Sequence, residues 1–357
     1  MLRKFPLFLL TVVACLVLNS PTNAETLIEE VYSKALNEKR KLMVRLPTDY
    51  ADSGSKRYPV LFILNEESNF EWASNIVAIQ ASRHGIEDML VVGLPHTGNY
   101  SGDNYPFKKK GSLELNEQAQ NHARFITEEA IRVIDQKYRT NGGRVIVGHS
   151  LSGLFVAHLF TQRTDVFSTF IALSPSLHHA PQMVDVMSEF LKKSPEINSQ
   201  IYLSLGELEH QKIQEQYARM KEMFHSKAPQ GLSWELNFMP HTDHMLAAYK
   251  GTYDALAWMY RHYTIQTHIV QKMTSTEIID HYGVLSKQLN YSIKPRQRAM
   301  TGLSGFLEKR VGDTKAAHAV MAAAAHFYPN ASDIRKRVDE LACAVAQSSG
   351  LPPAPDC

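Results

Sequence analysis

The sequence lacks a strong charge of either sign. Its 38 Lys and Arg residues stand against 36 Asp and Glu residues, which gives a formal net charge of +2. Arg3 and Lys4 supply this excess, because no other charged residue precedes Glu25. The rest of the chain is therefore balanced and has no basic stripe, so we do not expect nucleic acid as a partner.

Long apolar runs are also missing, apart from one near the start. FPLFLLTVVACLVL follows the basic MLRK and precedes NSPTNA, which ends in a small residue. This order is typical of a secretory signal peptide over 1–24, and the run is too short for a stable membrane anchor. We predict an exported protein, periplasmic or secreted, with no integral membrane span after cleavage at Ala24. The alternative is a lipoprotein attached through Cys15, since VVAC resembles a lipobox.

Cysteine is scarce, with three residues in the chain. Only Cys343 and Cys357 would remain after signal cleavage. In an oxidising compartment they can pair and close a loop of about 15 residues, worth roughly 3 kcal/mol in the chain-entropy model. We expect this disulfide, and two unpaired thiols are the alternative.

Metal-ligand patterns are absent from the sequence. There is no His-Glu-x-x-His segment, and HTDH offers His241 and His244 as a pair without a third ligand nearby. We therefore expect no metal site.

Two parts of the chain differ in their hydrophobic pattern. Residues 25–263 begin with a predicted hairpin and then alternate helical stretches with continuous apolar runs such as YPVLFIL and MLVVGL. This alternation predicts an α/β domain with a mostly parallel sheet covered on both faces. One of its helices is expected in RFITEEAIRVIDQKYRT, with Ile126, Ala130 and Ile134 on one face.

Residues 264–346 contain four predicted helical segments and no strand candidate. One of them, GDTKAAHAVMAAAAHFYPN, resembles the second helix of a tetratricopeptide-type hairpin. Two such hairpins are too few to stand alone, so we expect this segment to pack against the α/β domain. It could also contact a protein partner. Residues 347–357 are predicted to be a flexible tail.

The segment RVIVGHSLSG places polar residues where a predicted core strand ends and an apolar helix begins. It is similar to the nucleophile elbow G-x-S-x-G, a sharp turn that exposes a serine hydroxyl beside the first N–H groups of a helix. Ser150 is the candidate nucleophile, and Gly148 is needed because the turn is crowded. Ser152 replaces the second glycine, and we expect it to strain the turn modestly. The alternative is a serine that only caps the helix.

A serine nucleophile needs a base, and α/β-hydrolases supply an acid and then a histidine further along the chain. Glu209 follows the predicted strand QIYLSL, with Glu207 as an alternative acid, and His244 follows the predicted strand ELNFMP. These residues emerge from the carboxyl ends of strands, the edge that also carries Ser150. We therefore expect the three groups to meet.

Three segments closely resemble the putative-esterase (esterase D-like) family of the α/β-hydrolases: RFITEEAIRVIDQKYRT, GHSLSGLFVAHLF and FSTFIALSPSLHH. RKLMVRLPTDY matches the family's opening strands, and the helical end resembles the appendage of one bacterial subgroup. The resemblance implies an α/β-hydrolase fold and hydrolysis of a small-molecule ester without metal or organic cofactor.

The resemblance also assigns roles to individual residues. Ser150 becomes the nucleophile, His244 the base and Glu209 the acid. The expected oxyanion donors are backbone N–H groups of Leu151, Asn65 and Glu66, the last two standing where the family usually has Asp-Gly. The residues expected in the substrate pocket are Ser176, His178, His179 and Tyr105.

The loop that follows the second predicted buried strand argues against anionic or catecholate substrates. HTGNYSGDNYPF lacks the arginines that esterases acting on anionic or catecholate substrates would need. We therefore predict an exported serine carboxylesterase that forms an acyl-enzyme on Ser150. The alternatives are a trilactone siderophore esterase, acyl transfer to an acceptor other than water, and a non-catalytic binding protein whose helices recruit a partner.

Overall fold

The computed structural model describes residues 25–65, 67–348 and 357. The predicted signal peptide over 1–24, including Cys15, lies outside the described residues. Glu66 and residues 349–356 of the predicted tail also lie outside them.

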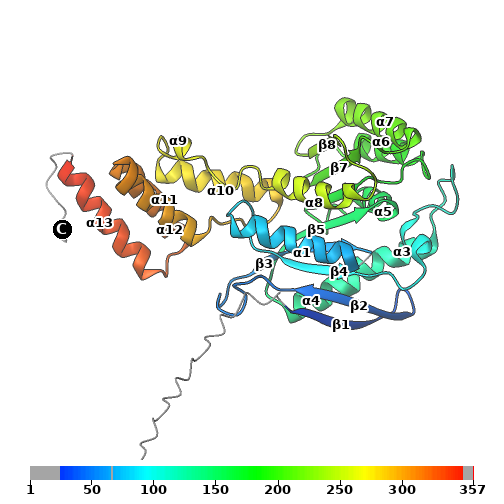
Figure 1. Cartoon of the computed structure of the whole chain (residues 1–357), viewed down its shortest axis with the longest axis horizontal. Helices are drawn as coiled ribbons and strands as arrows, with labels where there is room; N and C mark the ends of the chain where they lie inside the picture. Colours follow the sequence, from blue (N-terminus) through cyan, green and yellow to red (C-terminus); the bar gives the residue numbers. More distant parts are fainter. Residues whose placement is uncertain (1–24, 66, 349–356) are drawn as a thin grey trace, which may run out of the picture.

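Eight strands form one sheet in the order β1-β2-β4-β3-β5-β6-β7-β8 (Figure 1). The first two strands form the predicted antiparallel hairpin, β2 pairs antiparallel with β4, and the other neighbours are parallel. The mostly parallel sheet is thus confirmed. The strands are β1 (Thr26–Ser33), β2 (Glu38–Arg45), β3 (Tyr58–Leu64), β4 (Leu90–Leu94), β5 (Thr140–His149), β6 (Thr169–Leu173), β7 (Gln200–Gly206) and β8 (Ser233–Met239).

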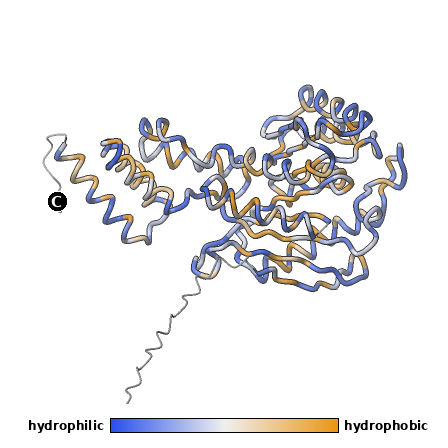
Figure 2. Tube along the Cα trace, in the orientation of Figure 1, coloured by the Kyte–Doolittle hydropathy of each residue, from blue (hydrophilic) through white to orange (hydrophobic). Residues whose placement is uncertain are grey.

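The inner strands are buried because helices cover both faces of the sheet. Every residue of β3, β4, β6 and β7 is buried, as their continuous apolar runs predict. In Figure 2 the strands are largely orange, whereas much of the helical exterior is blue. One core layer packs under α1 (Glu67–Ser82) and α8 (Leu246–Met259). The opposite layer packs under α3 (Glu117–Arg124), α4 (Ile131–Lys137), α5 (Leu151–Phe160), α6 (Met183–Lys193) and α7 (Gln211–Lys227).

The helix predicted in RFITEEAIRVIDQKYRT is longer at its start and shorter at its end than expected. Helices α3 and α4 are joined by a π-helical turn over Phe125–Ala130, so the helical path runs from Glu117 to Lys137. Its predicted inner face, Ile126, Ala130 and Ile134, is buried. The helix ends early because β5 already begins at Thr140. A short helix, α2 (Tyr100–Asn104), precedes it.

Beyond α8 the described chain contains helices and their connections but no strand. They extend sideways from the sheet, and α13 lies farthest from it (Figure 1). The four predicted segments are helical, and the structure adds the short α9. The helices are α9 (Thr267–Val270), α10 (Ser275–Leu289), α11 (Gln297–Phe306) with a π-helical turn over Leu307–Val311, α12 (Thr314–Phe327) and α13 (Ser332–Ser348). Buried side chains of α10–α13 belong to the same apolar cluster as those under α1 and α8, so this segment contacts the α/β domain, as expected.

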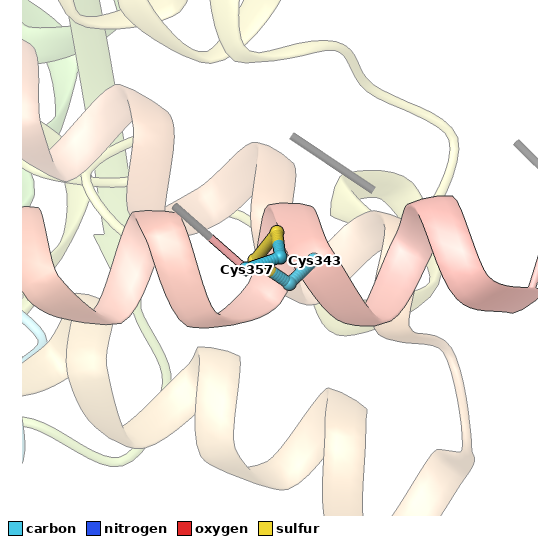
Figure 3. Close-up of a disulfide and its surroundings, with 2 residues drawn as sticks. All are labelled: Cys343 and Cys357. Atoms are coloured by element: carbon cyan, nitrogen blue, oxygen red, sulfur yellow. A yellow bond between two sulfur atoms is a disulfide. The ribbon is translucent and has the colours of Figure 1, made fainter. Parts of the chain in front are cut away.

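A disulfide joins Cys343 on α13 to Cys357, which confirms the expected pairing (Figure 3). Over the described ranges, no helix has both the length and the apolar composition required to cross a bilayer.

Candidate active site

Ser150 lies in the sharp turn between β5 and α5. Its φ of 60° and ψ of −118° form an unusual backbone conformation for a residue with a side chain. A Cβ atom on Gly148 would lie 2.3 Å from the carbonyl oxygen of Ser152, so the turn requires glycine there. The predicted elbow therefore exists, and it lifts the Ser150 hydroxyl to the carboxyl edge of the sheet.

His244 and Glu209 meet Ser150 at this edge. The Nε2 atom of His244 lies 2.9 Å from the Oγ atom of Ser150. Its Nδ1 atom lies 2.8 Å and 3.0 Å from the two carboxylate oxygens of Glu209. Because a carboxylate only accepts, Nδ1 carries the proton and Nε2 is left to accept from the serine hydroxyl. Glu209 has 2% side-chain exposure, so this bond is shielded from water.

Glu207, the alternative acid, faces another residue. Its Oε2 atom accepts a hydrogen bond of 2.7 Å from the backbone N–H of His241 and lies 3.5 Å from Nδ1 of that histidine. Glu207 thus supports the exposed turn that precedes His244, and the structure brings its carboxylate to His241 and not to His244. His241 is largely exposed and forms no part of the Ser150 contacts.

Ser152 was expected to strain the elbow modestly, but its surroundings show no such strain. It is buried, its backbone is helical, and its hydroxyl accepts from the His149 N–H and donates to the His149 carbonyl, both at 2.9 Å. The Asn65 side-chain amide also donates to this hydroxyl. A glycine could make none of these bonds, so Ser152 fastens the elbow to the loop that follows β3.

The prediction for Asn65 as a backbone oxyanion donor is wrong. Its N–H donates to the carbonyl of Leu94 at 3.1 Å, because the parallel pairing of β3 with β4 continues one step beyond the strand. Leu151 is the first residue of α5, where backbone N–H groups have no partner within the helix. Its N–H is therefore suitably located for an oxyanion. Glu66 lies outside the described residues.

The four residues predicted for the substrate pocket occupy different places. Ser176 is buried, and its Oγ atom lies 3.1 Å from that of Ser150, so it contacts the candidate nucleophile directly. The rings of His178 and His179 lie 3.9 Å apart, and the Tyr105 hydroxyl donates to the His179 carbonyl at 2.9 Å. These three residues form a connected cluster.

Burial lowers the pKa of His178 to about 4, with smaller contributions from nearby groups that include His179 and Lys110. His178 is therefore neutral near pH 7 and adds hydrogen-bonding capacity to this cluster without a charge.

Sequence reasoning missed the part played by His149. Its Nε2 atom lies 2.7 Å from the backbone carbonyl of His244, and the two rings are 4.7 Å apart. Since a carbonyl only accepts, Nε2 of His149 carries a proton and donates it. The elbow thus holds the backbone of the His244 loop. The histidine at this place in G-H-S was visible in the sequence, but its partner lies 95 residues away.

The segments that carry Glu209 and His244 also carry exposed apolar side chains. Leu208, Met245, Leu246 and Tyr249 are exposed large apolar residues next to Glu209 or His244, or on the first turns of α8. Tyr249 also packs edge-on against Trp72 of α1 at 6.3 Å between ring centroids. Exposed apolar side chains gathered beside a polar site are typical of a binding surface.

An α/β sheet that presents serine, a buried acid and histidine in this chain order defines the α/β-hydrolase class. The chain belongs to the putative-esterase family, whose model matches residues 33–259.

Individual relatives agree with this assignment. The chain is 30% identical over 175 residues to "Ferri-bacillibactin esterase BesA" of Bacillus subtilis (strain 168), a match that covers 43% of this chain and 60% of that protein. An IroE-like serine hydrolase from Shewanella oneidensis has a similar structure, with a TM-score of 0.75, 22% identity, and coverage of 85% of this chain and 100% of that one. An uncharacterised protein from Capnocytophaga ochracea has a TM-score of 0.64 and 16% identity, with coverage of 89% of this chain and 99% of that one. The last two likenesses concern the fold.

Proposed function

We propose that this protein is an exported serine carboxylesterase that acts through an acyl-enzyme on Ser150. The observation that carries the proposal is the continuous hydrogen-bond path from Glu209 through His244 to Ser150 at the strand-to-helix turn. Export is proposed from the signal-peptide pattern of residues 1–24.

Each group has a defined task in the proposed reaction. His244 accepts the Ser150 proton while the serine oxygen attacks the ester carbonyl, and it then returns the proton to the leaving alcohol. The carboxylate of Glu209 holds the imidazole in the required tautomer and stabilises its cation. The N–H of Leu151 is the proposed donor to the developing oxyanion. Water then attacks the acyl-enzyme with the same histidine as base.

The surroundings of the site favour an ester with an apolar or aromatic part. The exposed side chains of Met245, Leu246 and Tyr249 offer contacts for such a group next to His244. A siderophore ester is the second candidate, because the curated relative described above is an esterase of ferri-bacillibactin. The neutral imidazole of His178 offers a hydrogen-bond donor to a polar substrate of this kind.

A fluorophosphonate probe tests the nucleophile. We expect the mature wild-type protein to be labelled, because His244 can accept the serine proton as the hydroxyl attacks phosphorus. Labelling should be lost in Ser150→Ala and reduced at least about 100-fold in rate in His244→Ala. Absence of labelling in the wild type, or labelling that survives in Ser150→Ala, would rule out the serine-esterase proposal. The non-catalytic binding protein would then be the remaining candidate.

A panel of substrates separates the remaining candidates. Simple acyl esters, a feruloyl ester and a trilactone siderophore should be compared by kcat/KM, with an added alcohol to detect acyl transfer. Preference for the trilactone by about tenfold or more over the other esters would favour the siderophore candidate.

A further inference from the structure

A second cleft lies away from Ser150, where the helical segment meets the α/β domain. It encloses about 400 Å³, within the size range of small-molecule sites. Its wall comes from the residues that follow α1, from the loop after α8, and from α9, α10, α11 and α12. Figure 1 shows this junction, with α9–α12 extending sideways from the sheet. None of the three proposed catalytic residues lines it.

The cleft combines an apolar floor with a cationic rim. Ile278, Met300 and Val320 are buried and contribute to the floor. Arg83 and Arg298 line the cleft from opposite sides of the junction and are exposed. A solvent-accessible hollow of this composition can take an apolar body and a negative group together.

The positive charge of the rim is mostly uncompensated. Arg296 pairs with Asp88 at 2.7 Å, but its Nε atom is buried without a hydrogen-bond partner in the described part of the chain. No acidic side chain among the described residues lies within 4.0 Å of Arg83 or Arg298. No Asp or Glu of the described ranges lines the cleft. Three guanidinium groups thus line an apolar hollow, and among the described residues only that of Arg296 is paired with a carboxylate.

We propose that this cleft is a ligand site for a monoanionic amphiphile, a carboxylate with an apolar aliphatic or aromatic body. The guanidinium groups of Arg83 and Arg298 bind the carboxylate, and the floor formed by Ile278, Met300 and Val320 receives the apolar body. Because the walls come from both parts of the molecule, a bound ligand also links the helical segment to the α/β domain.

Calorimetric titration of the mature protein with sodium octanoate and with 1-octanol tests the site. Octanoate should bind at one site, and octanol should bind about tenfold more weakly or worse, because it lacks the charge that pairs with arginine. The double variant Arg83→Gln/Arg298→Gln should weaken octanoate binding by about tenfold or more. Both arginines are exposed, so these changes leave the core intact.

Two glycines of α11 provide a matched pair that locates the binding. Gly302 lines the cleft and Gly305 does not, and a Cβ atom on either meets no atom within 4 Å. Gly302→Phe should therefore fill the cleft and abolish octanoate binding, whereas Gly305→Phe should bind like the wild type. Ester hydrolysis should be unchanged in both variants. The proposal is overturned if octanoate does not bind, or if it binds equally to wild type, Gly302→Phe and the double arginine variant.

Discussion

At the scale of single residues, the two glutamates after β7 have different partners although they are two positions apart. Glu209 points to His244, and Glu207 points to the backbone of His241. Both follow the same predicted strand, so the sequence favoured Glu209 as the acid but left Glu207 as an alternative. The turn fixes the choice, because the N–H of Glu209 donates to the Gly206 carbonyl and directs the side chain inward.

This difference leads to a direct prediction. Glu209→Gln should lower kcat/KM for an ester by about 100- to 10,000-fold, because the amide can hold the histidine in the wrong tautomer. Glu207→Gln is the matched control and should change the rate less than about threefold, since its carboxylate does not contact His244. Steady-state kinetics with one ester substrate measures both. Equal losses in the two variants would contradict the assignment of the acid.

At the scale of elements, most of the sheet was predictable and the contacts between its loops were not. Continuous apolar runs such as Tyr58–Leu64 predict buried parallel strands because both faces of such strands are covered. The sequence also placed Ser150 and His244 at one edge. The contact of His149 with the His244 carbonyl and the bond from the Asn65 N–H to Leu94 depend on how separate strands align, which no local pattern encodes.

The turn between β5 and α5 depends on the glycine at position 148. Gly148→Ala should destabilise the protein by about 1–3 kcal/mol, because the new Cβ atom would lie 2.3 Å from the Ser152 carbonyl oxygen and the turn must shift. The rate at which a fluorophosphonate labels Ser150 should also fall in this variant. Gly283→Ala in α10 is the control, since a Cβ there meets no atom within 4 Å, and it should stabilise by about 0.5–1 kcal/mol. Urea unfolding of both variants measures the two changes in the free energy of unfolding. An equal or greater stability of Gly148→Ala than of the wild type would contradict the predicted crowding.

At the scale of the whole molecule, a buried polar junction joins the helical segment to the sheet. The hydroxyls of Tyr260 and Tyr291 lie 2.5 Å apart, and Arg296 pairs with Asp88. The sequence predicted that the helices pack against the α/β domain, but not that a carboxylate oxygen would be buried at this contact. Glu87, just before β4, has an Oε2 atom that is buried and lacks a hydrogen-bond partner among the described residues.

Glu87 makes the stability of this junction depend on pH. Burial raises its pKa from 4.5 to about 8, and the Tyr291 hydroxyl, which bonds to the carboxylate, opposes part of that rise. Below pH 4.5 the folded and unfolded chains both hold the proton. Between pH 4.5 and 8 only the folded chain holds it, so the free energy of unfolding falls as pH rises, by at most about 1.4 kcal/mol per pH unit.

Glu87→Gln removes this titration while keeping the shape of the side chain. Relative to wild type, the variant should therefore become progressively more stable from pH 5 to pH 8, and the difference should level off above that range. Urea unfolding at several pH values measures the difference. Glu222→Gln, an exposed change on α7 with the same loss of charge, should show a nearly constant difference across this range. A constant difference for Glu87→Gln as well would mean that this carboxyl group is ionised in the folded protein, and that the junction tolerates its charge.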